Sequence, residues 1–119
     1  MQYMLLIYGN EAEEAALPQA QRDAEMKEYF ALTEVAKQRG VEITDGDALH
    51  SVTTAKTVRV RNGKIEKIDG PFAETKEQLG GFYTLKADSL DKALEIAALI
   101  PGARHGSIEV RPVVDFSQG

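Results

Sequence analysis

The chain has 119 residues, a formal net charge of −5 and no cysteine. This length fits a single domain over residues 1–119, with a core that needs no disulfide. The lack of cysteine excludes thiolate chemistry and favours a reducing compartment. The net negative charge disfavours nucleic-acid binding, because an acidic surface repels phosphates.

The first apolar run, Gln2–Tyr8, is too short to cross a membrane and lacks the basic flank of a signal peptide. We therefore expect a cytoplasmic protein with no membrane partner.

In chain order, hydrophobic periodicity and turn residues predict a series of strands and helices. The expected elements are a strand over Gln2–Tyr8, a helix over Pro18–Arg39, a weak strand over Ala48–Val52, a hairpin over Thr57–Ile68, a strand over Gly80–Leu85, a helix capped by Asp88 or Ser89 and a strand over Ser107–Val114.

Three local signals refine this order. Asn62-Gly63 is the strongest short hairpin turn, because both residues accept a positive φ. Segment Val41–Asp47 contains Asp-Gly-Asp and is expected to be a connection. The first helix is expected to stop at Gly40 and to turn one apolar stripe toward the core. The residues of that stripe are Met26, Tyr29, Phe30, Thr33 and Ala36, and Leu32 and Val35 widen it.

The order of elements predicts an α+β fold. A ferredoxin-like split β-α-β arrangement with an antiparallel sheet places both helices on one face and leaves the other face bare. A second copy is the simplest cover for a bare sheet face, since two-fold dimers are the commonest oligomers. We therefore expect a homodimer, in which two sheets meet as a dimeric α+β barrel.

Segment Asp69–Tyr83, which begins Asp-Gly-Pro-Phe, resembles the DGPF-domain branch of the YCII-related family. The runs Arg59–Lys64 and Gly106–Pro112 are similar to the same branch. The resemblance implies a ferredoxin-like domain of the dimeric α+β barrel type, often found beside extracytoplasmic-function sigma factors. A narrower YCII group has a proposed His–Asp pair, with the His near the start of the first helix. Here Gln19–Asp23 holds no His, so only Asp69 is carried over as a catalytic candidate.

The Asp69-Gly70-Pro71 run has the chemistry of a rigid chain reversal. Phe72 is expected to anchor the following loop in the core, and Glu74 and Lys76 are candidates for ligand binding. Two interpretations stay open for this loop: an ordered support for a dimer, or the wall of a ligand pocket.

Few other residues have suitable chemistry. His105 is a catalytic candidate or an exposed loop residue, and with Arg104 it suits a small anionic ligand. Tyr83 is a ligand-binding candidate or a packing residue. His50 is expected to be a half-buried strand residue. No metal-ligand spacing occurs, so we expect neither a metal nor a cofactor.

Two functions follow as hypotheses. The first is a homodimeric module that binds a small ligand or a protein, with a sigma-factor-related protein as one candidate partner. The alternative is a lyase- or isomerase-like enzyme for a small anionic substrate, with Asp69 as acid or base and with Arg104 and His105 on the substrate. Separation of Asp69 from His105 on opposite sides of the domain would rule out that enzyme.

Overall fold

The structure is a computed structural model that describes residues 1–118. Its helices and strands are β1 (Gln2–Gly9), α1 (Glu11–Ala15), α2 (Gln19–Gln38), β2 (Glu42–Ala48), β3 (Lys56–Arg61), β4 (Lys64–Asp69), β5 (Gln78–Lys86), α3 (Leu90–Leu99) and β6 (Ser107–Pro112). The short 3-10 helices are η1 (Val52–Thr54), η2 (Pro101–Arg104) and η3 (Phe116–Gln118).

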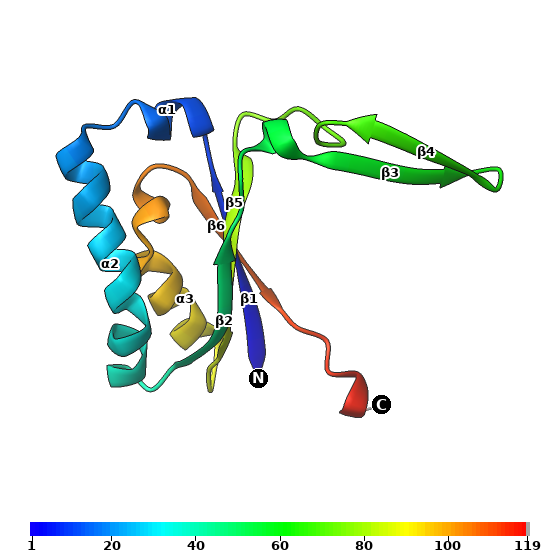
Figure 1. The fold of residues 1–119 in the computed structure, drawn as a ribbon. Helices are drawn as coiled ribbons and strands as arrows, with labels where there is room; N and C mark the ends of the chain where they lie inside the picture. Colours follow the sequence, from blue (N-terminus) through cyan, green and yellow to red (C-terminus); the bar gives the residue numbers. More distant parts are fainter. Residues whose placement is uncertain (119) are drawn as a thin grey trace.

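Four strands form one antiparallel sheet in the order β2-β5-β1-β6. Helices α2 and α3 both lie on one face of this sheet, and strands β3 and β4 form a separate ribbon on the other side (Figure 1). The fold is therefore α+β with antiparallel sheets, as the order of elements predicts. Within residues 1–118, no helix is long and apolar enough to span a membrane.

The core lies between this sheet and the two helices. Leu5 and Leu85 on the central strands are fully buried and face small helical residues, which let the helices approach the sheet closely. The buried core side chains are Tyr3, Leu5, Leu32, Ala36, Val41, Leu85, Ala87, Ala93, Ile96, Ala97 and Ile100.

Helix α2 ends as its sequence predicts. Gly40 adopts φ +80°, and its N–H donates to the Lys37 carbonyl at 3.0 Å. The Val41 N–H donates to the Ala36 carbonyl at 2.9 Å, and Val41 is buried. This pair of bonds is a Schellman motif, which satisfies carbonyls that the helix end leaves unpaired.

The predicted core stripe of α2 is wrong in part. Phe30 is 80% exposed and Met26 is also exposed, whereas Leu32 and Ala36 are buried. The face turned to the sheet follows positions 25, 29, 32 and 36, and it starts with Glu25, which is only partly exposed. The prediction from hydrophobic periodicity counted Met26 and Phe30 as core residues because they are apolar. Single exposed apolar residues are common on protein surfaces, so the pattern alone did not identify the core face.

Segment Val41–Asp47 belongs to strand β2 except for Val41 and is not a connection, whereas Ala48–Val52 is not a strand beyond Ala48, the last residue of β2. Gly46 lies on β2 opposite Tyr83, where an added Cβ would come within 2.5 Å of the Tyr83 ring. The glycine therefore makes room for an aromatic ring and does not form a turn. The acidic, alanine-rich stretch after Asn10 forms helix α1, which the periodicity did not predict.

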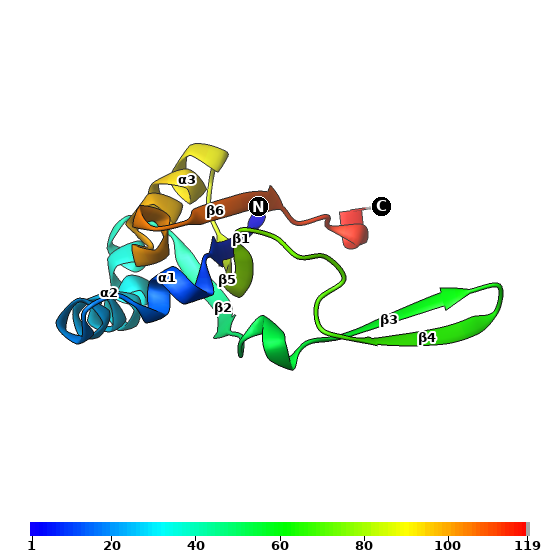
Figure 2. The same cartoon turned by 90° about the horizontal axis from the view of Figure 1, so that it is seen from above.

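The hairpin prediction is confirmed. Asn62 and Gly63 have φ +51° and +76°, as a two-residue turn with two positive φ values requires. We call residues 56–69 the arm. It extends from the sheet side opposite α2 and α3 (Figure 2). Phe72, just after the arm, is 76% exposed, so the expectation that it anchors the loop in the core is wrong.

The sheet face away from the helices has an apolar centre. Strand alternation places Met4, Leu6 and Tyr8 of β1 on this face, beside Phe82 and Thr84 of β5. All five are only partly buried, although they lie on the two central strands. We call this surface the open face.

Gly81 allows close approach of two strands, because an added Cβ would lie 2.8 Å from the Asp47 carbonyl oxygen of β2. We expect Gly81→Ala to destabilise the fold by about 1–3 kcal/mol, since the backbone itself must shift. Gly80→Ala is the matched control, because its Cβ would meet only Ile7 O at 3.9 Å. Urea unfolding measures both; an equal effect of the two substitutions would contradict this prediction.

Candidate functional site

A cleft opens on the helix side of the sheet, between β5 and the N-terminal half of α2. It consists of two adjoining hollows of about 660 and 330 Å³, which share Glu14, Met26 and Tyr29 among their lining residues. These volumes fall in the range of small-molecule sites. A larger hollow of about 880 Å³ surrounds Met1 and Val113, but no histidine or tyrosine lines it.

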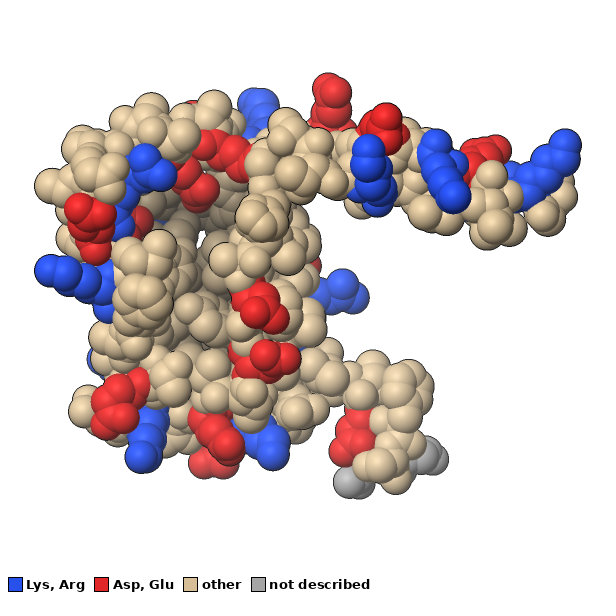
Figure 3. Space-filling view, in the orientation of Figure 1, with Lys and Arg blue, Asp and Glu red and all other residues tan. Residues whose placement is uncertain are grey.

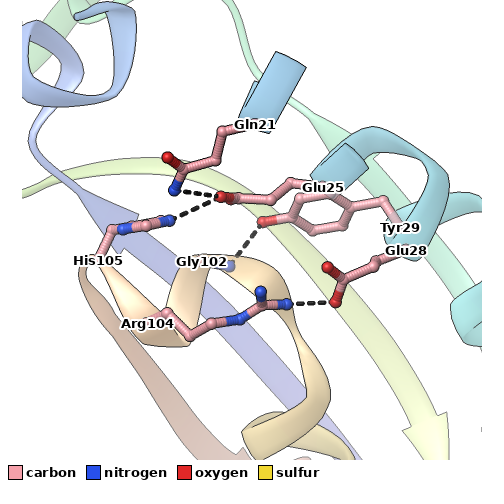
Figure 4. Close-up of polar contacts among 7 residues, drawn as sticks. All are labelled: Gln21, Glu25, Glu28, Tyr29, Gly102, Arg104 and His105. Carbon is pink, nitrogen blue, oxygen red and sulfur yellow. Dashed lines mark hydrogen bonds and ion pairs between the residues drawn. The ribbon is translucent and has the colours of Figure 1, made fainter. Parts of the chain in front are cut away.

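A histidine–glutamate pair lies at the cleft. His105 follows η2, and its Nε2 is 2.8 Å from Oε2 of Glu25 on α2 (Figure 4). The Glu25 oxygen also accepts a bond from Gln21 Nε2 at 3.1 Å. Because a carboxylate can only accept, Nε2 carries the proton, and Nδ1 of a neutral His105 is then the basic nitrogen. Both side chains are mostly buried, with 25% and 12% exposed.

The electrostatics favour an ionised Glu25. Burial alone would raise the pKa of Glu25, but the hydrogen bonds from His105 and Gln21 outweigh it and hold the pKa below its ordinary value. The carboxylate can therefore orient the imidazole, as the acidic member of a catalytic dyad does.

Two tyrosines line the cleft. Tyr29 Oη accepts a hydrogen bond of 3.1 Å from the Gly102 N–H, which ties α2 to η2. An added Cβ at Gly102 would lie 3.0 Å from this oxygen, so glycine is what lets the two elements meet. Burial raises the pKa of both Tyr29 and Tyr83, so both hydroxyls stay protonated near neutral pH.

Glu14 of α1 supplies a second carboxyl group. Its burial raises its pKa, nearby Glu11, Glu25 and Glu77 add to the increase, and His105 opposes it. The carboxyl group lies over Gly9, where an added Cβ would come within 2.2 Å of Glu14 Oε1. Within residues 1–118, no hydrogen bond to this carboxyl group is found, in contrast to Glu25.

Glu11 has a structural role at the edge of the cleft. Its carboxylate accepts hydrogen bonds from Ser51 Oγ at 2.8 Å and from the Val52 N–H at 3.1 Å. Its own N–H donates to Gln78 Oε1 at 3.1 Å. Glu11 thus joins α1 to η1 and to the start of β5, and it holds that side of the cleft in place.

The structure does not bring Asp69 to this cleft. Asp69 ends β4 on the arm, is 90% exposed and forms a 2.6 Å ion pair with Lys56. His105 lies on the opposite side of the sheet, beside the helices (Figures 1 and 4). Within one chain, the two catalytic candidates from the sequence therefore do not form one site.

The other ligand-binding candidates divide between the two sides. Tyr83 lines the cleft, and Arg104 lies beside it but forms an ion pair with Glu28. Glu74 and Lys76 are exposed in the loop before β5, where the Lys76 carbonyl accepts a bond from Asn10 Nδ2 at 3.0 Å. At each of these positions, ligand binding stays a prediction.

His50 also differs from expectation. It lies in the irregular segment after β2, is exposed, and lines the wider hollow of the cleft.

In the part of the chain that the structure describes, no group of three or more acidic, histidine or cysteine side chains has the geometry of a metal site.

Sequence reasoning found His105 and Tyr83 but missed Glu14, Glu25 and Tyr29 as residues of the cleft. One signal was available for Glu25: it precedes Tyr29 by four residues and Leu32 by seven, so it lies on the face of α2 that turns to the sheet. A carboxylate on such a face is unusual and points to a specific partner.

The fold and cleft define a one-sided α+β domain with a pocket of acid–base groups between sheet and helices. A family model described as "YCII-related domain" matches residues 1–117. The chain is also 36% identical over 121 residues to an uncharacterized protein of Rhizobium meliloti (strain 1021), with 100% of this chain and 97% of the relative covered. The chain belongs to the YCII-related domain family.

The raised pKa of Glu14 has a consequence for stability. A carboxyl group whose pKa is raised by folding stabilises the protein at a pH below the ordinary pKa of the group, which is 4.5. This contribution is lost as the pH rises through the folded-state pKa. We therefore expect Glu14→Gln to raise Tm at pH 7 and to lose this advantage at pH 4. Thermal unfolding across this range measures the effect.

Glu13→Gln is the control, because Glu13 is an exposed residue in the same first turn of α1. Both substitutions remove one favourable charge from the helix N-terminus, so that effect cancels. An equal change in Tm for the two variants at pH 7 would show that the surroundings of Glu14 do not disfavour its charge.

Proposed function

We propose that this chain is a homodimeric small-ligand-binding domain, of the DGPF type within its family, and that it holds its ligand in the cleft at His105. One observation carries the proposal. Titratable side chains from α1, α2 and the residue after η2 converge on a hollow of ligand size with a tyrosine lining. Such convergence in a cleft is typical of functional sites.

The finer fold assignment belongs to this proposal. The order β2-β5-β1-β6, with α2 and α3 on one face, supports a ferredoxin-like arrangement. The apolar centre of the open face supports a second copy placed sheet to sheet, as in a dimeric α+β barrel. The Asp69-Gly70-Pro71-Phe72 sequence supports the DGPF branch.

The charge of the cleft points to a neutral or positively charged ligand. Glu11, Glu14 and Glu25 line the wider hollow, and Arg22 is its only lysine or arginine among the described residues. Arg104, which suggested an anionic ligand from the sequence, is engaged by Glu28. An organic cation would gain from the carboxylates and from the faces of the tyrosine rings.

Catalysis in the same cleft is a second candidate. Glu14 has a raised pKa and His105 is oriented by Glu25, so one group can donate a proton while the other accepts one. This pairing would suit a lyase- or isomerase-like proton transfer and would need no role for Asp69. A partnership with a sigma-factor-related protein stays a prediction from the family resemblance.

Benzylamine and benzoate are matched probes, with similar size and opposite charge. We expect benzylamine, and not benzoate, to raise Tm at millimolar concentration and pH 7. At ten times its Kd, a ligand stabilises the folded state by about 1.4 kcal/mol, which corresponds to a few degrees in Tm. Differential scanning fluorimetry measures this increase.

The increase should disappear in the variant Glu14→Gln/Glu25→Gln and persist in Glu28→Gln. Glu28 is the matched control, because it lies on the same helix but pairs with Arg104 outside the cleft lining. Stabilisation by benzoate alone would favour the anionic ligand expected from the sequence. An unchanged response in the double variant would place the binding site elsewhere.

A further inference from the structure

The arm does not pack on its own subunit. Strands β3 and β4 pair with each other and make no extensive contact with any other helix or strand of residues 1–118. A compact chain of this length has a radius of gyration of about 13.5 Å, whereas this chain has 16.5 Å. The subunit is therefore more extended than a complete globular domain.

The exposed area leads to the same conclusion. A compact monomer of this mass exposes about 6,300 Å², and this chain of 13.0 kDa exposes 8521 Å². The excess is about 2,200 Å² per chain, or about 4,400 Å² for two chains, which lies within the range that obligate homodimers bury. The extra surface is thus enough for a stable dimer.

The arm has one apolar and one charged face. The register pairs Val60 with Ile65 and Val58 with Lys67, so the three apolar side chains lie on one face. All three are more than half exposed. Arg59 pairs with Glu66 on the other face. An exposed apolar strand face of this kind marks an interaction surface.

The arm and the remainder of the chain carry net charges of opposite sign. The arm carries five Lys or Arg and two Asp or Glu, a net charge of +3, while the remainder carries nine against seventeen, a net charge of −8. Figure 3 shows lysine and arginine side chains along the arm and many acidic side chains on the body of the subunit. A positive arm is therefore attracted to the body of another copy of the same chain.

The open face offers a matching surface. Its apolar centre is flanked by Asp45 and Asp47 on edge strand β2 and by Glu109 on β6, all exposed. Strand β2 has one unpaired edge, because it ends the sheet. The arm and the chain end after β6 both extend to this side of the sheet (Figure 1).

We propose that the arm of each subunit crosses to a second copy, where its valine face covers apolar surface on the sheet and its basic residues meet the carboxylates at the edges. This inference rests on the proposed homodimer and specifies how it forms. Two-fold symmetry gives two such crossings per dimer, so each subunit both donates and receives an arm.

Sedimentation equilibrium of the full chain tests this directly. We expect twice the 13.0 kDa mass at micromolar concentration. A monomer at this concentration would mean that the arm does not join two copies of the chain, and the proposal would be wrong.

Val58→Thr/Val60→Thr/Ile65→Thr removes the apolar face of the arm and keeps strand propensity. We expect this variant to weaken dimerisation at least a hundredfold while the helical far-UV signal is retained, because α2 and α3 pack on the core sheet and not on the arm. The control, Met26→Gln/Phe30→Gln, replaces exposed apolar residues of α2 and should leave the dimer intact. Dissociation of the control but not of the arm variant would overturn the proposal.

Leu6→Thr tests the open face without altering the arm, because Leu6 lies at the centre of that face. If Leu6→Thr dissociates the dimer and the arm variant does not, the sheet-to-sheet dimer stands and the arm crossing is wrong.

The salt dependence of dimerisation gives an independent measure. We expect the dimer Kd to rise about tenfold from 0.05 to 0.5 M NaCl, because screening weakens the attraction between the arm and the body of the other copy. A Kd that is constant or falls with salt would contradict the proposed contacts.

Discussion

The packing of one sheet face against α2 and α3 is the constraint on which the remaining structure depends. Leu5 and Leu85 of the two central strands are fully buried on that face, and alanines of both helices allow close approach. Among residues 1–118, the same packing leaves the opposite face only partly buried. It therefore determines both where a cleft can form, between helices and sheet, and which face of the sheet is left open.

The fold was predictable where local chemistry determines structure. Asn62-Gly63 fixed the hairpin and Gly40 fixed the end of α2, because each glycine needs a positive φ that few residues accept. Strand β2 was not predictable, because Gly46 has the sequence signature of a turn but serves to accommodate the Tyr83 ring. That requirement arises only when β2 and β5 are side by side.

The candidate site was predictable in His105 and Tyr83 but not in its carboxylates. The chain has two histidines, so His105 was a candidate by scarcity. Its partner Glu25 is one of 19 acidic residues, and its role depends on how α2 crosses η2, which the Tyr29–Gly102 hydrogen bond fixes. Asp69 had the clearest motif, but its location on the arm, paired with Lys56, gives it no contact with the cleft of its own subunit.

The arm is a ribbon of only two strands, and such a ribbon is marginally stable in water without a third strand or a covering layer. Whether the arm stays folded as a hairpin therefore depends on contacts with a surface that covers it. For the proposed dimer, backbone amides of the arm should exchange with solvent rapidly in dilute solution while those of strand β1 stay protected, and the arm should gain protection as the protein is concentrated. In the proposed dimer, local order in this chain is thus a function of its abundance.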